Sequence, residues 1–410
     1  MTGKPVAKRL VFHIGGYDPI TSHLGAQRRF VREIARFQRT WSVKASVDGF
    51  RDSADQVGWN VTTTGPDWLV ETDYRLVRWD DVIEAVGRRS IGSRISAGVL
   101  AFLDFVLSGT LWRYSVTNWR YAGFFLYPFV MFGLFVAAAF LIGAAAFKIT
   151  GSIPVAVGGG LVGFAAVLAG PWRWLHLGDL FDDWIFSREY IRRGNPEIEQ
   201  RLDRLAGELA AAASDGAADE ILVLGHSLGA VLAVDLLDRA LKLQPALAGD
   251  KMPITFLSVG SSILKVGLHP KAIRFRAAMD RVAKSRAIFW GDYQALIDPL
   301  NFYKSRPMAQ MGLSTQSDAT VRIVKLSRML DNDMYQRIRF HFFRLHNQFV
   351  SGNDRRTSYD YFMLTCGPVS AKSQTLAPDG ALSMIAGDGG LIASATLSEG
   401  ELLGSPGAAA

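Results

Sequence analysis

A serine flanked by glycines is the residue whose surroundings most clearly indicate chemistry. Residues 220–237 read EILVLGHSLGAVLAVDLL, which predicts an apolar strand, a sharp turn at Ser227 and a helix of small and apolar residues. The pattern G-x-S-x-G is typical of a nucleophile elbow, where side chains larger than those of Gly225 and Gly229 would collide. Such a turn would expose the Ser227 hydroxyl and direct the Leu228 N–H to the same spot. The alternative is an ordinary strand-to-helix turn with a capping serine.

A nucleophilic serine needs a base that accepts its proton, and the sequence offers two main histidines for this role. Both lie in the late stretch RFHFFRLHNQFVSGND. We favour His346, because it falls where an apolar run gives way to a loop, over His341, which could equally belong to a half-buried aromatic cluster. The other histidines are assigned to the elbow itself, to the first strand and helix, to a segment near the membrane and to a loop before a proline: His226, His13, His23, His176 and His269.

A carboxylate must orient the base, and two aspartates follow a predicted strand in the stretch AIFWGDYQALIDPLNFY. We favour Asp298, because Pro299 would fix a tight turn directly after it, over Asp292, which lies nearer the end of the strand. The resulting chain order is Ser227, Asp298, His346.

A second donor for an oxyanion is expected from another loop. The first predicted strand ends in FHIGGYDP, where two glycines would let backbone N–H groups approach a developing negative charge. The predicted oxyanion hole therefore combines Leu228 with the backbone of Ile14, Gly15 and Gly16.

These residues require a framework of strands that alternate with helices, which predicts a mainly parallel sheet. Short apolar runs predict strands at residues 9–14, 41–47, 58–65, 74–83, 220–224, 252–262, 286–293 and 321–327. Helical spacing of apolar residues predicts helices over 21–41, 195–216 and 228–241.

The composition indicates that part of the chain lies in lipid. The mean hydropathy is +0.14, a positive value that soluble domains seldom reach. The net charge is +7 and the pI is about 9.5, but the arginines flank an apolar block instead of forming one patch interleaved with aromatic residues, which argues for a membrane surface and against nucleic acid. The lone cysteine, Cys366, excludes an intrachain disulfide and a cysteine-based zinc site.

Two apolar runs predict a transmembrane hairpin. Residues 121–147 contain no charge, a bilayer span needs about 20 residues, and Lys148 alone separates this run from residues 152–170. A buried hairpin in a soluble core is the alternative, although such a hairpin would normally show a polar face. Arginines on both sides place both flanks in the cytoplasm: Arg88, Arg89, Arg94, Arg113, Arg120, Arg173, Arg188, Arg192 and Arg193.

Residues 95–112 are apolar apart from Asp104, and a carboxylate within a span is costly. We therefore expect an interfacial helix here and not a third span. An even number of crossings also keeps the first strand and the elbow on one side of the membrane. The predicted organisation is an N-terminal part of the catalytic domain (1–90), an interfacial segment (91–120), a hairpin (121–170), the C-terminal part with the elbow (171–369) and a flexible Ala/Gly/Ser-rich tail (370–410).

The motifs HIGG, GHSLG, DPL and LHNQF, in this order, resemble the α/β-hydrolase superfamily, and within it the lipase-like serine hydrolases. The resemblance implies an α/β-hydrolase fold, an acyl-enzyme intermediate, an ester, thioester or amide substrate, and no cofactor or metal. Two departures are the hairpin inserted between the oxyanion segment and the nucleophile, and HIGG where lipases more often carry His-Gly.

The sequence thus predicts an integral membrane serine esterase whose catalytic domain faces the cytoplasm, in a membrane of the bacterial inner type. Its expected partners are the bilayer and an acyl-ester or lipid-like substrate. A non-catalytic membrane-anchored scaffold that retains the fold is the alternative. A transporter has little support, because the two apolar runs hold no polar residues that would form a pathway.

Overall fold

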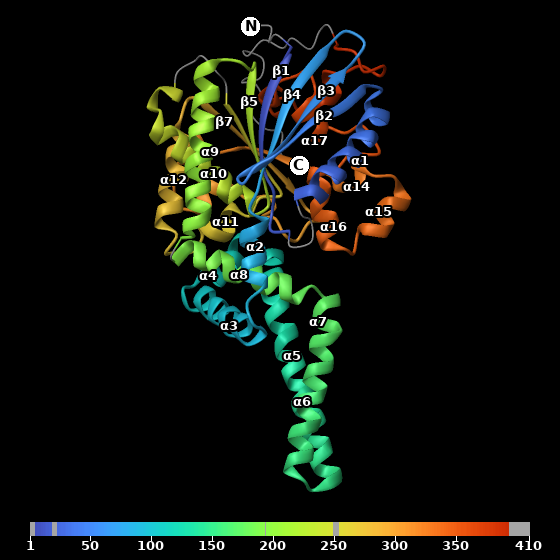
Figure 1. Cartoon of the computed structure of the whole chain (residues 1–410), viewed down its shortest axis with the longest axis vertical. Coiled ribbons are helices and arrows are strands. Elements are labelled where there is room, and N and C mark those ends of the chain that lie inside the picture. The colour runs from blue at the N-terminus through green and yellow to red at the C-terminus, as the bar shows by residue number, and fades with distance from the viewer. Residues whose placement is uncertain (1–4, 19–22, 193, 249–253, 393–410) are drawn as a thin grey trace. The chain divides into compact units, whose positions relative to one another are not determined.

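The computed structural model describes residues 5–18, 23–192, 194–248 and 254–392 (Figure 1). The chain divides into two units. The sheet unit comprises Met1–Asp80, Pro196–Leu268 and Ala272–Ala410, and the helical unit comprises Asp81–Asn195 and His269–Lys271.

An eight-stranded sheet organises the sheet unit, with strand order β2-β3-β4-β1-β5-β6-β7-β8. β2 pairs with β3 and β3 with β4 in antiparallel fashion, while every other neighbouring pair is parallel. The prediction of an α/β fold with a mainly parallel sheet is therefore confirmed. The strands are β1 (Lys8–Ile14), β2 (Lys44–Asp52), β3 (Gln56–Thr64), β4 (Leu69–Val77), β5 (Glu220–His226), β6 (Ile254–Val259), β7 (Ile288–Ala295) and β8 (Thr320–Val324).

The two central strands, β1 and β5, bring the oxyanion segment and the elbow together. Both are almost continuously apolar and buried, as parallel strands covered on both faces are. In their register Phe12 pairs with Val223, and Ile14 pairs with Gly225. The carboxyl ends of β1 and β5 therefore lie side by side, although the whole helical unit separates them in sequence.

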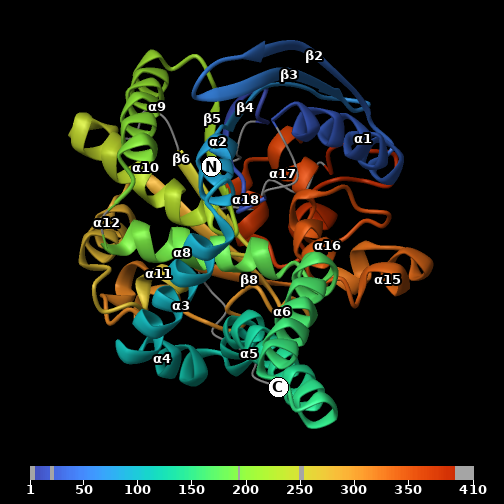
Figure 2. The same ribbon diagram turned by 60° about the horizontal axis from the view of Figure 1, so that its bottom comes forward.

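Helices cover both faces of the sheet (Figures 1 and 2). One face carries α9 (Pro196–Asp215), α10 (Gly229–Leu243) and α12 (Ile273–Lys284), and the other carries α1 (His23–Trp41), α17 (Tyr361–Cys366) and α18 (Ala371–Leu376). The remaining helices of this unit are α11 (Ile263–Gly267), α13 (Pro307–Gln310), α14 (Leu326–Met329), α15 (Asn332–Ile338) and α16 (Phe342–His346). Helix α2 (Asp80–Gly87) belongs to the helical unit from Asp81 onward. Residues 74–83, predicted as one strand, are divided between β4 and α2.

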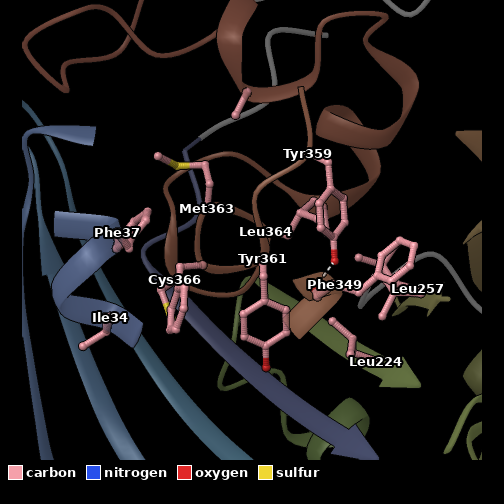
Figure 3. Packing of buried hydrophobic residues seen from close by; sticks show 14 of the residues in the cluster. Ile34, Phe37, Leu224, Leu257, Phe349, Tyr359, Tyr361, Met363, Leu364 and Cys366 are labelled. Atoms are coloured by element: carbon pink, nitrogen blue, oxygen red, sulfur yellow. Dashed lines mark hydrogen bonds between the residues drawn. The ribbon is translucent and has the colours of Figure 1, made fainter. Parts of the chain in front are cut away.

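The main apolar core lies between the sheet and α1. Helix α1 buries Phe30, Ile34, Phe37 and Trp41, which recur at helical spacing and so share one face. Figure 3 shows Ile34 and Phe37 from this helix with side chains of β5, β6 and α17 in the same cluster, which includes the buried Cys366.

Composition predicted a flexible tail from residue 370, but residues 371–392 contain α18, a short 3-10 turn and a β-bridge between Ile385 and Leu391. Ala371, Ala377 and Ala381 are buried in the main core. Small residues favour close packing as readily as flexibility: a Cβ on Gly380, whose φ is +52°, would lie 1.9 Å from the Ser358 carbonyl oxygen. Residues 393–410 lie outside the described residues.

The helical unit contains α3 (Ile91–Leu107), α4 (Thr110–Thr117), α5 (Trp119–Thr150), α6 (Ile153–Ala169), α7 (Pro171–Trp174) and α8 (Leu177–Arg192). Among the described helices, α5 is long and apolar enough to cross a membrane, whereas α6, with 17 residues, is shorter. Glycines let α5 and α6 approach closely, because a Cβ on Gly143 would lie 2.7 Å from the Ala156 carbonyl oxygen.

The first turns of α5 pack against other helices of the helical unit. Phe125 contacts Phe105 and Trp184, and Phe129 contacts Phe102.

Candidate active site

Ser227 occupies a strained turn between β5 and α10. Its φ is +54°, a left-handed value that residues other than glycine rarely adopt. The turn is held by backbone hydrogen bonds. The Ser227 N–H donates to the Val259 carbonyl (3.1 Å), and the Ser227 carbonyl accepts from the Ser262 N–H (3.0 Å). The side chain of Ser227 remains half-buried at the carboxyl edge of the sheet.

The two glycines of the elbow are required by close backbone contacts. A Cβ on Gly225 would lie 2.4 Å from the Ala230 Cα, and a Cβ on Gly229 would lie 2.1 Å from the Ile14 carbonyl oxygen. Both distances are far shorter than a van der Waals contact. The turn between β5 and α10 therefore fits against the end of β1 only with glycine at both positions.

The loop after β1 passes directly beside the serine. A Cβ on Gly16 would lie 2.7 Å from the Ser227 Cβ and 3.3 Å from its Oγ, whereas a Cβ on Gly15 would meet nothing within 4 Å. Ile14 belongs to β1 and its carbonyl packs against Gly229. Of the predicted oxyanion residues in this loop, Gly16 is thus the one beside the Ser227 side chain, and Leu228 directly follows Ser227 at the start of α10.

His346 and Asp298 form a direct hydrogen-bonded pair. His346 Nδ1 lies 2.7 Å from Asp298 Oδ2, and both side chains are buried. Asp298 follows β7 in a tight turn, in which its Oδ1 accepts from the Leu300 N–H (2.9 Å) and Asn301 Nδ2 donates to its carbonyl (2.7 Å). These hydrogen bonds hold the Asp298 carboxylate in place. His346, which lies 48 residues later in the chain, contacts it there.

The His346 ring lies next to the elbow. Its centroid is 4.5 Å from the ring of His226, the residue that precedes Ser227. A Cβ on Gly260, which follows the hydrogen-bond partner of the Ser227 N–H, would lie 3.0 Å from His346 Cε1. His346 Nε2 is buried and makes no hydrogen bond within the described part of the chain. The nitrogen opposite the Asp298 contact is therefore the one available to accept a proton.

The two alternative residues lie elsewhere. Asp292 points into the interior of the sheet, where Ser258 Oγ and Gln294 Nε2 donate to its carboxylate, and burial raises its pKa to about 6. His341 is exposed at the start of α16 and forms no ion pair with a carboxylate among the described residues. Neither residue takes part in the pair that His346 and Asp298 form.

Two buried histidines near the site were not anticipated from sequence as part of it. The His226 ring lies next to the His346 ring at an interplanar angle of 33°, and burial, reinforced by the charge of His346, lowers the pKa of His226 well below its ordinary value. His13 Nδ1 contacts the hydroxyls of Tyr74 and Tyr361, and burial lowers its pKa to about 3. One signal in the sequence could have identified both histidines. His226 directly precedes the elbow serine, and His13 directly precedes the Ile14–Gly16 segment.

Comparisons of the chain with protein-family models, with curated proteins and with solved structures gave no match. The class that the structure itself defines is an α/β protein with an eight-stranded, mostly parallel sheet. Within the described residues, no group of three or more histidine, cysteine, aspartate or glutamate side chains is arranged to hold a metal ion.

Proposed function

We propose that the protein is a membrane-anchored serine hydrolase that cleaves carboxylic esters. One observation carries the proposal: a serine in a strained strand-to-helix turn lies at the same sheet edge as a buried His346–Asp298 pair, whose ring packs beside the elbow. A triad is recognised by this geometry and by these roles, not by the position of its members in the sequence.

In the proposed mechanism, Ser227 Oγ bonds to the acyl carbonyl carbon while its proton passes to His346 Nε2. Asp298 keeps the imidazole oriented and stabilises its charged form. The tetrahedral intermediate collapses, the ester C–O bond breaks, and His346 returns the proton to the departing alcohol. Water then attacks the acyl-enzyme with His346 again as base, which releases the carboxylic acid and restores Ser227.

The negative charge that develops on the carbonyl oxygen is stabilised by the N–H groups of Leu228 and Gly16, beside the N-terminus of α10. Removing one such donor typically costs about 100-fold to 1,000-fold in turnover. Esters, thioesters and amides all pass through such an intermediate, and we assign an ester because an anchored site meets acyl-lipid esters at the membrane surface.

Helices α5 and α6 are proposed to cross the membrane as a hairpin. The pairing of β1 with β5 supports two crossings, because the chain leaves one strand and returns to its neighbour in the same sheet. The arginines on both sides of the hairpin support a cytoplasmic position for the sheet unit, and the membrane is of the bacterial inner type in this proposal.

Helix α3 is proposed to lie at the membrane surface. One of its faces packs within the helical unit, with Asp104 paired to Arg188 (3.1 Å) and Arg192, and Arg94 paired to Asp182 (2.5 Å). The opposite face exposes four apolar residues, Val99, Leu100, Leu103 and Leu107, and α4 and the start of α5 expose Trp112, Val116 and Trp119. Apolar and tryptophan side chains beside the start of a span are typical of the membrane–water interface.

A fluorophosphonate probe tests the proposal, because it reacts with activated serine nucleophiles. It should label the full-length protein in detergent and fail to label Ser227→Ala. Ser262→Ala is the matched control, since it keeps the backbone N–H that holds the elbow and should be labelled like the wild type. A non-catalytic scaffold predicts no labelling of any of the three proteins. Esters of p-nitrophenol with graded acyl chains would then define the chain length.

A further inference from the structure

A partly buried arginine of α1 contacts the segment that carries His346. Arg29 Nη2 donates to the Asn347 carbonyl and to Ser351 Oγ, both at 3.3 Å. Asn347 directly follows His346 in the chain. The guanidinium of Arg29 therefore lies beside the candidate site, and long contacts from a single nitrogen leave most of its hydrogen-bonding capacity unused.

No carboxylate neutralises this guanidinium within the described residues. Glu33 is the one acidic residue of α1, and it accepts from Arg32 (3.1 Å), Arg36 (3.3 Å) and the Gly352 N–H (3.3 Å). Asp354, near the same helix, faces Arg36 (3.4 Å). A partly buried cation without an anionic partner is unfavourable, so the position is suited to an anion supplied from outside the chain.

The segment that Arg29 contacts is basic in its sequence. Residues 334–353, which include His346, contain Arg337, Arg339 and Arg344 and no aspartate or glutamate. The charge of Arg29 also reaches the imidazoles next to the elbow and the oxyanion segment, where it adds to burial in lowering the pKa of His226 and His13. A guanidinium close to the site attracts a substrate group of the opposite charge.

We propose that Arg29 binds an anionic group of the substrate, a carboxylate or a phosphate, while Ser227 attacks the neighbouring acyl carbonyl. The planar guanidinium matches both groups and can bind them through two parallel hydrogen bonds. The inference rests on the proposed hydrolase function and narrows its substrate class to anionic esters. A soluble half-ester and an anionic lipid headgroup both supply this chemistry.

The test compares two soluble esters of similar size on the purified full-length protein in detergent: neutral p-nitrophenyl butyrate and the anionic mono-p-nitrophenyl ester of glutaric acid. Arg29→Gln should lower kcat/KM for the anionic ester at least about tenfold more than for the neutral one, as expected for loss of a charge-assisted contact. Arg28→Gln is the matched control, because Arg28 is the exposed neighbour on the same helix and should leave the ratio between the two esters unchanged.

A second arm measures fatty-acid release from phosphatidylglycerol and from phosphatidylcholine in mixed micelles. A selective loss with the glutarate ester alone identifies a soluble anionic substrate, and a selective loss with phosphatidylglycerol identifies a lipid headgroup. Equal losses on neutral and anionic substrates would overturn the proposal and assign Arg29 to holding the Asn347–Ser351 turn, and no loss in either arm would also overturn it. Absence of fluorophosphonate labelling in the wild type would instead remove the hydrolase function, and the anion site with it.

Discussion

Exposed apolar side chains have different meanings in the two units of the protein. Leu243, at the end of α10 in the sheet unit, is 61% exposed, and Leu141, in α5 of the helical unit, is 66% exposed. Leu243 follows the charged Lys242, and single exposed apolar residues are ordinary on soluble surfaces. Leu141 lies in a run without charges, beside α6, which has no buried residue at all within its described length. If α5 crosses a membrane as proposed, Leu141 contacts lipid while Leu243, at nearly equal exposure, contacts water.

Both units bury polar groups, among them Asp182 and His269 in the helical unit, but those of the sheet unit gather at the candidate site. The sheet unit buries His13, His226, Asp292, Asp298 and His346 close to the carboxyl edge of its strands. Burying such groups costs free energy that only specific hydrogen bonds offset, and a dense set of them is typical of functional sites. Under the proposed function, chemistry belongs to the sheet unit and lipid contact to the helical unit, and the variants below test this division.

The largest effect is expected from the base of the triad. His346→Ala should lower kcat for p-nitrophenyl ester hydrolysis by about 1,000-fold or more, because it removes the proposed base that accepts the Ser227 proton. His341→Ala, an exposed position five residues earlier on the same segment, should stay within about twofold of the wild type. Comparable activity in the two variants would remove His346 from the mechanism and break the assignment of chemistry to this edge of the sheet.

The two glycines of the oxyanion loop should behave differently. Gly16→Ala would place a Cβ 2.7 Å from the Ser227 Cβ and push the loop away, which should cost about 100-fold in kcat. Gly15→Ala meets nothing within 4 Å and should cost less than about threefold. Steady-state kinetics, with thermal unfolding as a check on folding, measures both. Equal losses would place the oxyanion donor somewhere other than Gly16.

Gly15 and Gly16 illustrate which features could be predicted from the sequence and which could not. The α/β fold followed from apolar runs alternating with helical periodicity, because central parallel strands are buried on both faces. Glycine at both elbow positions followed from the G-x-S-x-G pattern. The contact that requires Gly225 is local, with the Ala230 Cα at 2.4 Å, whereas the contact that requires Gly229 is with the distant Ile14 carbonyl oxygen at 2.1 Å. Sequence could not distinguish Gly15 from Gly16, since the difference comes from contact with a residue more than 200 positions away.

The choice between carboxylates was open for a similar reason. Asp292 and Asp298 follow the same strand signal, but Asp292 is still within β7 and points to Ser258, whereas Asp298 lies beyond its end. The ring contact between His226 and His346 joins segments 120 residues apart and has no local signature. The fold of residues 371–392 was missed because alanine and glycine occur both in mobile tails and in tightly packed segments.

A single charged substitution in α5 tests whether this helix contacts lipid. Leu141→Arg places a guanidinium near the middle of the proposed span, at a cost of about 3 kcal/mol, or roughly 100-fold in the insertion equilibrium. The fraction of protein that resists carbonate extraction from membranes should fall accordingly. Leu243→Arg, at nearly equal exposure, should leave this fraction unchanged. If both variants stayed in the membrane fraction, α5 would not be in contact with lipid.

The smallest effect concerns pH and the buried His13. Its pKa is about 3 in the folded protein and 6.5 in the unfolded chain, so between these values the unfolded chain binds a proton that the folded protein does not. Stability should therefore fall as pH decreases through this window, by about 1.4 kcal/mol per pH unit for this group. His13→Gln removes the titrating group, while its amide can still bond to the Tyr74 hydroxyl. The difference in unfolding temperature between wild type and variant, measured in detergent at pH 6.5, 5.5 and 4.5, should shift in favour of the variant at each step. If the unfolding temperatures of wild type and variant changed in parallel with pH, water would reach His13. The sheet unit would then not shield this buried polar group.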